Sequence, residues 1–172
     1  YKKQLEKFND VLCVTSSSAL SNNYESAIKG RELLNSEEKK HIFIVDSKNI
    51  SAGQSIIILE AIEMIADQRK IDEIIRKIDG LIERVNLYCV VEKSDWWNKE
   101  KKSWFQKKTR YSLGEIKKGK IIHTENVKDA NFANAIFKKI ERNSKREIEN
   151  GKRIRVVIAH GDNLEEAEKL KK

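Results

Sequence analysis

The sequence predicts an α/β fold, with a parallel, Rossmann-like sheet in a first domain and a smaller α/β second domain after it. Over residues 1–92, short apolar runs alternate with helical patterns in the order strand, helix, strand, helix, helix, strand. Such alternation is typical of parallel strands that helices cover. Residues 1–92 carry 13 Lys/Arg against 15 Asp/Glu, a net charge of −2, whereas residues 93–172 carry 22 against 12, a net charge of +10. We therefore expect two domains, 1–92 and 93–172, with a boundary near residues 92–95.

Six elements are predicted in the first domain, each from its own sequence signal. Apolar runs that end in polar residues indicate buried strands, and apolar residues at a spacing of about 3.6 indicate an amphipathic helix. Asn22 and Glu25 resemble a capping box at the start of the first helix. Ser51 begins a helix that is apolar nearly all round, so we expect it to be buried on more than one face. The predicted strands are 11–15, 41–45 and 85–91, and the predicted helices are 22–34, 51–67 and 71–82.

The basic second domain contains a different set of signals. All three tryptophans lie among many lysines within residues 93–120. Further on, Asn163 and Glu166 resemble the start of a capped helix. The predicted elements are strands at 119–124 and 154–159 and helices at 130–142 and 164–172. The chain starts and stops inside helical patterns, which we interpret as a sign that it is a fragment of a longer protein.

Composition and motifs exclude several classes of protein. No apolar run approaches the ~20 residues that a membrane-spanning helix needs. Cys13 and Cys89 both lie in apolar runs, as buried thiols do in the reducing cytoplasm. The sequence has no phosphate-binding glycine loop, no nucleophile elbow, and no spacing of histidines or carboxylates that would hold a metal. No catalytic constellation stands out, and we expect a cytoplasmic protein without a metal or cofactor.

A hydroxyl-rich segment after the first predicted strand is the strongest functional signal. The apolar run from Val11 ends in four hydroxyl residues, Thr15 to Ser18, and a helical pattern begins at Ser21 or Asn22. Hydroxyl groups and the free N–H groups of a first helical turn favour an anion. The second strand ends in Asp46 and Ser47. Because ligands of parallel sheets bind at the carboxyl ends of the strands, we expect both segments to share one site.

Two linked motifs resemble the DegV family of bacterial fatty-acid-binding proteins. The first is Ser17-Ser18-Ala19-Leu20-Ser21 followed by Tyr24-Glu25-Ser26-Ala27, and the second is Val45-Asp46-Ser47-Lys48 followed by Ser51 and Gly53. The segment Ile158-Ala159-His160-Gly161-Asp162 is also similar to the second domain of that family. The chain departs from the family pattern at Asn22, where the family usually has glycine.

The resemblance implies a carrier that binds one long-chain fatty acid between two α/β domains. It implies that hydroxyl groups hold the carboxylate, with Ser17, Ser18, Ser21 and the backbone of Asn22 as the binding residues. Asp46 and Ser47 are candidates for the same pocket, and the long apolar helix is a candidate wall for the acyl chain. The resemblance also implies a partner, a fatty acid kinase that phosphorylates the bound acid, and a carrier that is monomeric and not itself catalytic.

Two alternatives remain open on the sequence alone. Aromatic residues interleaved with lysines in residues 93–120 could bind nucleic acid, although such a segment is more often an amphipathic surface. The same segment could dock an acidic partner or make transient contact with an anionic membrane. An enzyme with an anion site at residues 17–22 is the third possibility.

Overall fold

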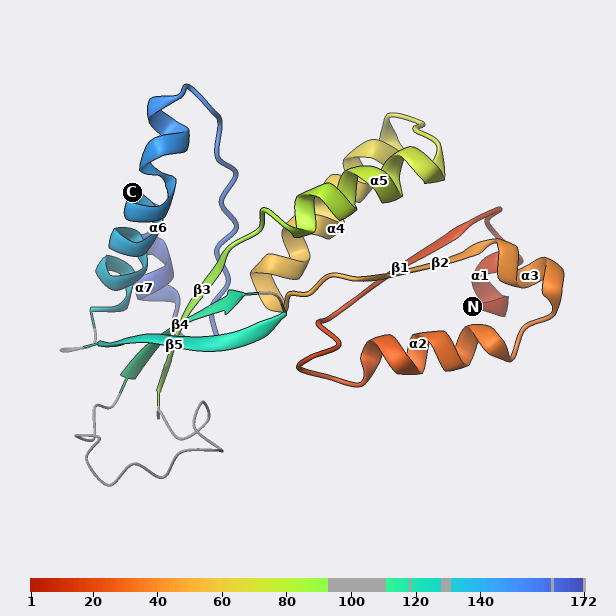
Figure 1. Cartoon of the computed structure of the whole chain (residues 1–172), viewed down its shortest axis with the longest axis horizontal. Helices are drawn as coiled ribbons and strands as arrows, with labels where there is room; N and C mark the ends of the chain where they lie inside the picture. Colours follow the sequence, from red (N-terminus) through yellow and green to blue (C-terminus); the bar gives the residue numbers. More distant parts are fainter. Residues whose placement is uncertain (93–110, 118, 128–130, 162, 172) are drawn as a thin grey trace. The chain divides into compact units, whose positions relative to one another are not determined.

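The structure is a computed structural model that describes residues 1–92, 111–117, 119–127, 131–161 and 163–171. The chain forms two compact units: Tyr1–Val85 together with Lys118–Lys120, and Asn86–Lys117 together with Ile121–Lys172. Figure 1 labels the elements, which are α1 (Lys2–Leu5), β1 (Val11–Thr15), α2 (Asn23–Glu32), α3 (Ser36–Lys40), β2 (Ile42–Asp46), α4 (Ser51–Ala66), α5 (Ile71–Ile82), β3 (Leu87–Glu92), β4 (Tyr111–Lys117), β5 (Lys120–Val127), α6 (Phe132–Glu149) and α7 (Leu164–Lys169).

The first unit is built on the parallel pair β1 and β2. The register runs from Val11 opposite Ile42 to Thr15 opposite Asp46, so both strands end at the same level. α2 packs against both strands, and α4 packs against β1 and α5. The predicted α/β fold is confirmed, and the parallel pairing places the two segments that follow β1 and β2 next to each other.

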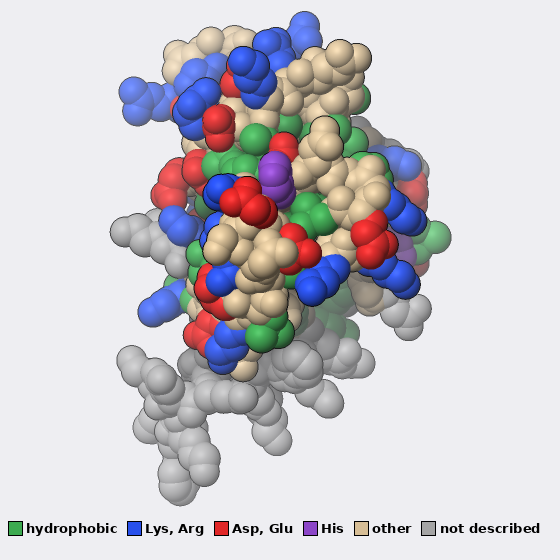
Figure 2. Space-filling model, turned by 90° about the vertical axis from the view of Figure 1, so that its right-hand side faces the viewer, with side chains coloured by type: hydrophobic (Ala, Val, Ile, Leu, Met, Phe, Trp, Pro, Cys, Tyr) green, Lys and Arg blue, Asp and Glu red, His purple; other side chains and the backbone are tan. Residues whose placement is uncertain are grey.

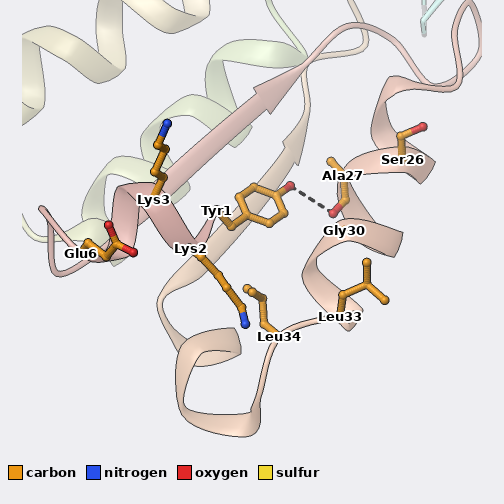
Figure 3. A pocket seen from close by; sticks show the side chains of 9 residues that line it. All are labelled: Tyr1, Lys2, Lys3, Glu6, Ser26, Ala27, Gly30, Leu33 and Leu34. Atoms are coloured by element: carbon orange, nitrogen blue, oxygen red, sulfur yellow. Dashed lines mark hydrogen bonds between the residues drawn. The ribbon is translucent and has the colours of Figure 1, made fainter.

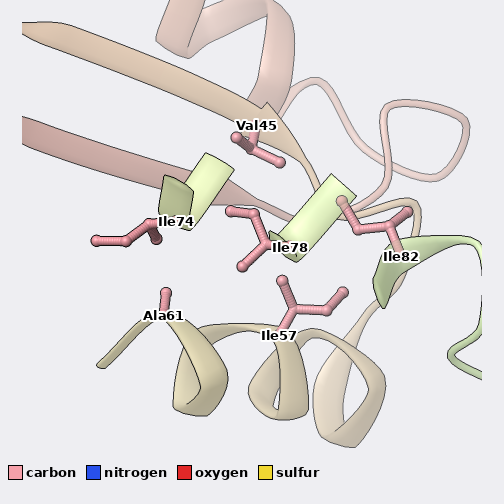
Figure 4. Packing of buried hydrophobic residues seen from close by; sticks show 6 residues of the cluster. All are labelled: Val45, Ile57, Ala61, Ile74, Ile78 and Ile82. Carbon is pink, nitrogen blue, oxygen red and sulfur yellow. The ribbon is translucent and has the colours of Figure 1, made fainter. Parts of the chain in front are cut away.

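The core of the first unit lies where α4 and α5 meet β2. Figure 4 shows side chains from these three elements pointing toward one another, namely Val45, Ile57, Ala61, Ile74, Ile78 and Ile82. Burial of an isoleucine side chain stabilises a fold by about 1.5–3 kcal/mol. The opposite face of α4 exposes Leu59 and Ile62. The expectation that α4 is buried on more than one face is therefore wrong within the described residues.

The second unit contains a sheet with the strand order β3-β4-β5. β3 and β4 are antiparallel, with Leu87 opposite Ile116 and Glu92 opposite Tyr111. α6 packs against β3 and also contacts α7. The side chain of Glu166 in α7 accepts a hydrogen bond from the N–H of Ala133 at 2.9 Å, so it ties α7 to the first turn of α6. This hydrogen bond is the main reason why the pKa of Glu166 lies below its usual value.

Several sequence predictions differ from the structure of this part. The strand predicted at 85–91 is not a parallel strand of the first unit. It forms β3, which pairs with β4 in the antiparallel sheet. β4 is not predicted from the sequence, so this pairing could not be foreseen. Residues 154–159 form no strand; Ile154 and Val156 are exposed there. α6 ends at Glu149, beyond the expected 142. The predicted boundary at residues 92–95 lies largely outside the described residues.

Capping residues define the ends of several helices. Asn35 and Glu38 form a capping box on α3, a helix that the sequence analysis did not include. Asn163 accepts a hydrogen bond from the N–H of Glu166, as expected for α7. The expected capping box of Asn22 and Glu25 is absent, because the side chain of Asn22 makes no capping hydrogen bond.

No helix within the described residues is long and apolar enough to cross a membrane. Across the same residues, no group of three or more His, Cys, Asp or Glu side chains is placed to hold a metal ion. Cys13 and Cys89 are free thiols, and burial raises the pKa of Cys89 to about 11.

Candidate functional site

The segments that follow β1 and β2 are joined by backbone hydrogen bonds. The N–H of Ser47 donates to the carbonyl of Thr15 at 3.1 Å, and the N–H of Ser17 donates to the carbonyl of Asn49 at 2.8 Å. Parallel strands that end at the same level present their next residues at one edge of the sheet. The structure therefore brings the two predicted hydroxyl segments together at this edge.

Some of these hydroxyl groups are buried and point into the protein. The side chain of Ser17 is 0% exposed, and its hydroxyl donates to the carbonyl of Gly119 at 2.6 Å. Ser47 is also fully buried, and its hydroxyl donates to the carbonyl of Asn49 at 3.0 Å. Thr15 donates to the carbonyl of Val45 at 3.3 Å. Because an unpaired buried polar group costs free energy, these hydrogen bonds stabilise the fold of the two segments.

Asp46 holds the segment after β1 from the side of β2. Its Oδ2 atom accepts from the hydroxyl of Ser18 at 2.6 Å, and its Oδ1 atom accepts from the backbone N–H of Ser18 at 3.2 Å. The same Oδ1 atom accepts from the N–H of Lys48 at 2.9 Å. A carboxylate of the protein therefore already occupies the donors of Ser18.

Lys48 lies in a backbone conformation that most residues avoid. Its φ angle is 48°, in the left-handed region. Its ammonium group donates to the carboxylate of Glu83 at 2.7 Å, and this hydrogen bond raises the pKa of Lys48. The ammonium group of Lys48 is therefore paired with Glu83 at the end of α5, outside the serine segment.

A second, more open group of polar side chains lies between β1 and α2. The hydroxyls of Ser16 and Ser21 are 2.8 Å apart, and the side-chain amide of Asn23 donates to the hydroxyl of Ser16 at 2.9 Å. The N–H of Asn23 donates to the hydroxyl of Ser21 at 3.4 Å. We name Ser16, Ser21 and Asn23 the open serine cluster.

The open serine cluster can donate hydrogen bonds to an incoming anion. The amide of Asn23 has two hydrogens, of which one is directed to Ser16. The two serine hydroxyls have two hydrogens and share one short contact. The cluster also lies at the start of α2, where the N–H groups of the first turn favour negative charge. This arrangement is suited to a carboxylate oxygen.

The sequence prediction of the site and the structure agree on position but differ in detail. Ser21 lies in the open serine cluster, Asn22 is exposed beside it, and Ser17, Ser18, Asp46 and Ser47 engage one another or the backbone. Sequence reasoning missed Asn23, Asn49 and Gly119. Asn23 is adjacent to the predicted motif, but no local signal connects Gly119 to a serine that precedes it by about one hundred positions.

A cavity of about 670 Å³ lies elsewhere in the first unit. Figure 3 shows its lining residues, which come from α1, α2 and the segment after α2: Tyr1, Lys2, Lys3, Glu6, Ser26, Ala27, Gly30, Leu33 and Leu34. The hydroxyl of Tyr1 donates to the carbonyl of Ala27 at 3.0 Å across it. Burial raises the pKa of Tyr1 to about 12. This cavity contains none of the predicted site residues.

The described residues on the face drawn in Figure 2 carry charges of both signs. On the face shown in Figure 2, Lys and Arg side chains are interspersed with Asp and Glu side chains. The tryptophan- and lysine-rich segment, residues 93–120, lies mostly outside the described residues, so its predicted role stays a prediction.

Comparison with known proteins decides the family. A family model described as "Uncharacterised protein, DegV family" matches residues 1–100 of this chain. The chain belongs to the DegV family. The match covers both segments of the candidate site, so the resemblance of the two serine motifs is confirmed.

Curated relatives in the DegV family are longer than this chain. A DegV domain-containing protein of Staphylococcus aureus strain COL is 25% identical over 170 residues, which are 95% of this chain and 58% of the relative. One from Clostridium acetobutylicum is 27% identical over 95 residues, which are 55% of this chain and 33% of the relative. The chain thus spans between a third and three fifths of these relatives.

Solved DegV structures share the fold. A DegV family protein from Eubacterium eligens, loaded with heptadecanoic acid, has a TM-score of 0.76 at 17% identity, and the match covers 98% of this chain and 62% of that one. The fatty acid kinase B3 protein of Streptococcus pneumoniae, loaded with linoleic acid, has a TM-score of 0.69 at 15% identity, with 83% and 54% covered. At these identities the likeness establishes the fold. Both neighbours are described as loaded with a fatty acid.

Proposed function

We propose that this chain is part of a DegV carrier that binds a long-chain fatty acid, with the open serine cluster holding the carboxylate. The observation that carries the proposal is the pairing of Ser21 with Ser16 and Asn23 at the start of α2. These donors lie at the carboxyl end of β1, within the part of the chain that the family model matches. An acyl chain needs only dry apolar volume, since each buried CH₂ contributes ~0.8 kcal/mol.

Among the predicted binding residues, Ser21 is our choice for direct contact with the carboxylate. Its hydroxyl has only hydroxyl and backbone neighbours, whereas Ser18 already donates to the carboxylate of Asp46. A second carboxylate next to Asp46 would be repelled. We therefore propose that the ligand carboxylate binds to the open serine cluster and not to Ser18.

We further propose that the carrier presents the bound carboxylate to a fatty acid kinase in the cytoplasm. The support is the shared fold with a protein that is named as a component of fatty acid kinase. In that reaction the kinase, not the carrier, would transfer a phosphoryl group from a nucleotide to a carboxylate oxygen. The two free thiols agree with a reducing compartment.

The affinity of the Ser21→Ala variant for a long-chain fatty acid tests the proposal. A hydrogen bond to a charged group contributes about 1.5–3 kcal/mol, so we expect the dissociation constant of oleate to rise by about tenfold to a hundredfold. Isothermal titration of the protein at its full natural length would measure it. Ser55→Ala is a matched control, because the hydroxyl of Ser55 donates to its own helix at Ser51 and lies outside the cluster.

Two results would contradict the proposal. The first is a wild-type protein that binds no fatty acid in the titration and yields none when lipids are extracted after purification. The second is a Ser21→Ala variant with the same dissociation constant as wild type, which would remove Ser21 from the site.

A further inference from the structure

We infer that Ser17 is a positioning residue for Ser21, and that the carbonyl of Gly119 holds it in place. The inference rests on the proposed function of the open serine cluster and assigns Ser17 a role different from direct ligand binding. Gly119 belongs to the same compact unit as Ser17, as part of the stretch Lys118–Lys120.

Ser17 connects to Ser21 through its backbone. Its carbonyl oxygen accepts from the N–H of Ser21 at 3.0 Å and lies 3.5 Å from the hydroxyl of Ser21. The same carbonyl accepts from the N–H of Leu20 at 3.0 Å. A shift of Ser17 would therefore move the backbone and the hydroxyl of Ser21 together.

Ser17 itself is held from two directions. Its N–H donates to the carbonyl of Asn49 at 2.8 Å, and its hydroxyl donates to the carbonyl of Gly119 at 2.6 Å. The same hydroxyl accepts from the N–H of Ala19 at 3.3 Å. With the side chain fully buried, the hydroxyl of Ser17 has its hydrogen directed to Gly119 and is closed to an external ligand.

Gly119 is suited to this role because a larger residue would disturb Ser17. Its φ angle is +80°, which side chains other than glycine rarely adopt. A Cβ atom at this position would lie 2.8 Å from the hydroxyl oxygen of Ser17. Glycine therefore lets the backbone approach closely enough for its carbonyl to accept the buried hydroxyl.

The test compares fatty acid affinity with local backbone protection in Ser17→Ala and Gly119→Ala. We expect each variant to raise the dissociation constant of oleate by about fivefold to tenfold. This is the effect of losing one hydrogen bond in the series that connects Gly119 through Ser17 to Ser21. We also expect faster hydrogen exchange at the Ser21 amide, measured by NMR on the ligand-free protein. In the double variant the added Cβ no longer meets a hydroxyl, so the two effects should be less than additive.

The matched control is Ser112→Ala. Ser112 is a fully buried serine whose hydroxyl has no hydrogen-bond partner within the described residues. Its replacement removes the same atoms at the same burial and should change neither oleate affinity nor exchange at Ser21.

The outcomes separate the inference from the proposed function. Unchanged exchange at Ser21 in Ser17→Ala overturns the inference, and if affinity still falls, Ser17 contacts the ligand directly. Unchanged affinity in Ser17→Ala, with weakened binding in Ser21→Ala, overturns the inference and leaves the proposed function in place. Unchanged affinity in Ser21→Ala overturns the proposed function and the inference with it.

Discussion

At the scale of single residues, the serines of the first unit divide into two groups that the sequence presents as one run. Ser17 and Ser47 are fully buried and pair with backbone carbonyls, whereas Ser16 and Ser21 remain part of an open cluster. The run predicts a polar site at the end of a strand, and the structure brings polar side chains together there. The division depends on Asn49 and Gly119, which no local pattern connects to the run.

Asp46 gives a residue-scale prediction, since its carboxylate accepts three hydrogen bonds from Ser18 and Lys48. We expect Asp46→Ala to lower the free energy of unfolding by about 1–3 kcal/mol, because it leaves these donors without their acceptor. Asp46→Asn keeps the Oδ1 acceptor and should lose less. Urea denaturation measures both.

The control for Asp46 is Asp67→Ala, at an exposed aspartate just after α4. It should change the free energy of unfolding by no more than about 0.5 kcal/mol, as is usual for surface substitutions. Equal stability of Asp46→Ala and wild type would contradict the proposed role of Asp46 in holding the serine segment.

At the scale of elements, the periodicity of apolar residues predicts where a helix lies in the sequence better than it predicts which faces of that helix are buried. The pattern of α5 predicts its buried isoleucines, and Ile74, Ile78 and Ile82 are indeed buried. α4 is apolar nearly all round, so its sequence does not mark the side of Leu59 and Ile62 as exposed. The strand predicted at 154–159 is absent from the structure for a related reason. An apolar run forms a strand only where another strand pairs with it, and the residues of the run do not determine whether such a partner is present.

Packing of α4 gives the element-scale prediction. Ile57 is 0% exposed in the core, whereas Ile62 on the same helix is 54% exposed. We expect Ile57→Ala to lower the free energy of unfolding by about 2–5 kcal/mol, because it leaves a cavity. Ile62→Ala is the matched control and should change the free energy of unfolding by less than about 1 kcal/mol. The side chain of Ile62 is already largely exposed, so little buried apolar area is lost, and alanine favours the helix. Equal losses in chemical denaturation would show that α4 is covered on both faces.

At the scale of the whole molecule, family membership and the serine cluster support one account. The family model covers residues 1–100, and solved DegV structures share the fold over most of the chain. The sequence predicts the α/β class and the two hydroxyl segments because these depend on local patterns. The order of strands in the second sheet depends on β4, which lies within residues 93–120 and has a short, mixed sequence without clear alternation.

The most direct test compares oleate with its methyl ester in titrations of the wild-type protein. The two ligands have the same acyl chain, but only oleate has a charged carboxylate for the donors of Ser16, Ser21 and Asn23. We expect oleate to bind at least about tenfold more tightly than the ester, since hydrogen bonds to a charged group contribute about 1.5–3 kcal/mol. Equal affinity for the two ligands would contradict the claim that the open serine cluster holds the carboxylate.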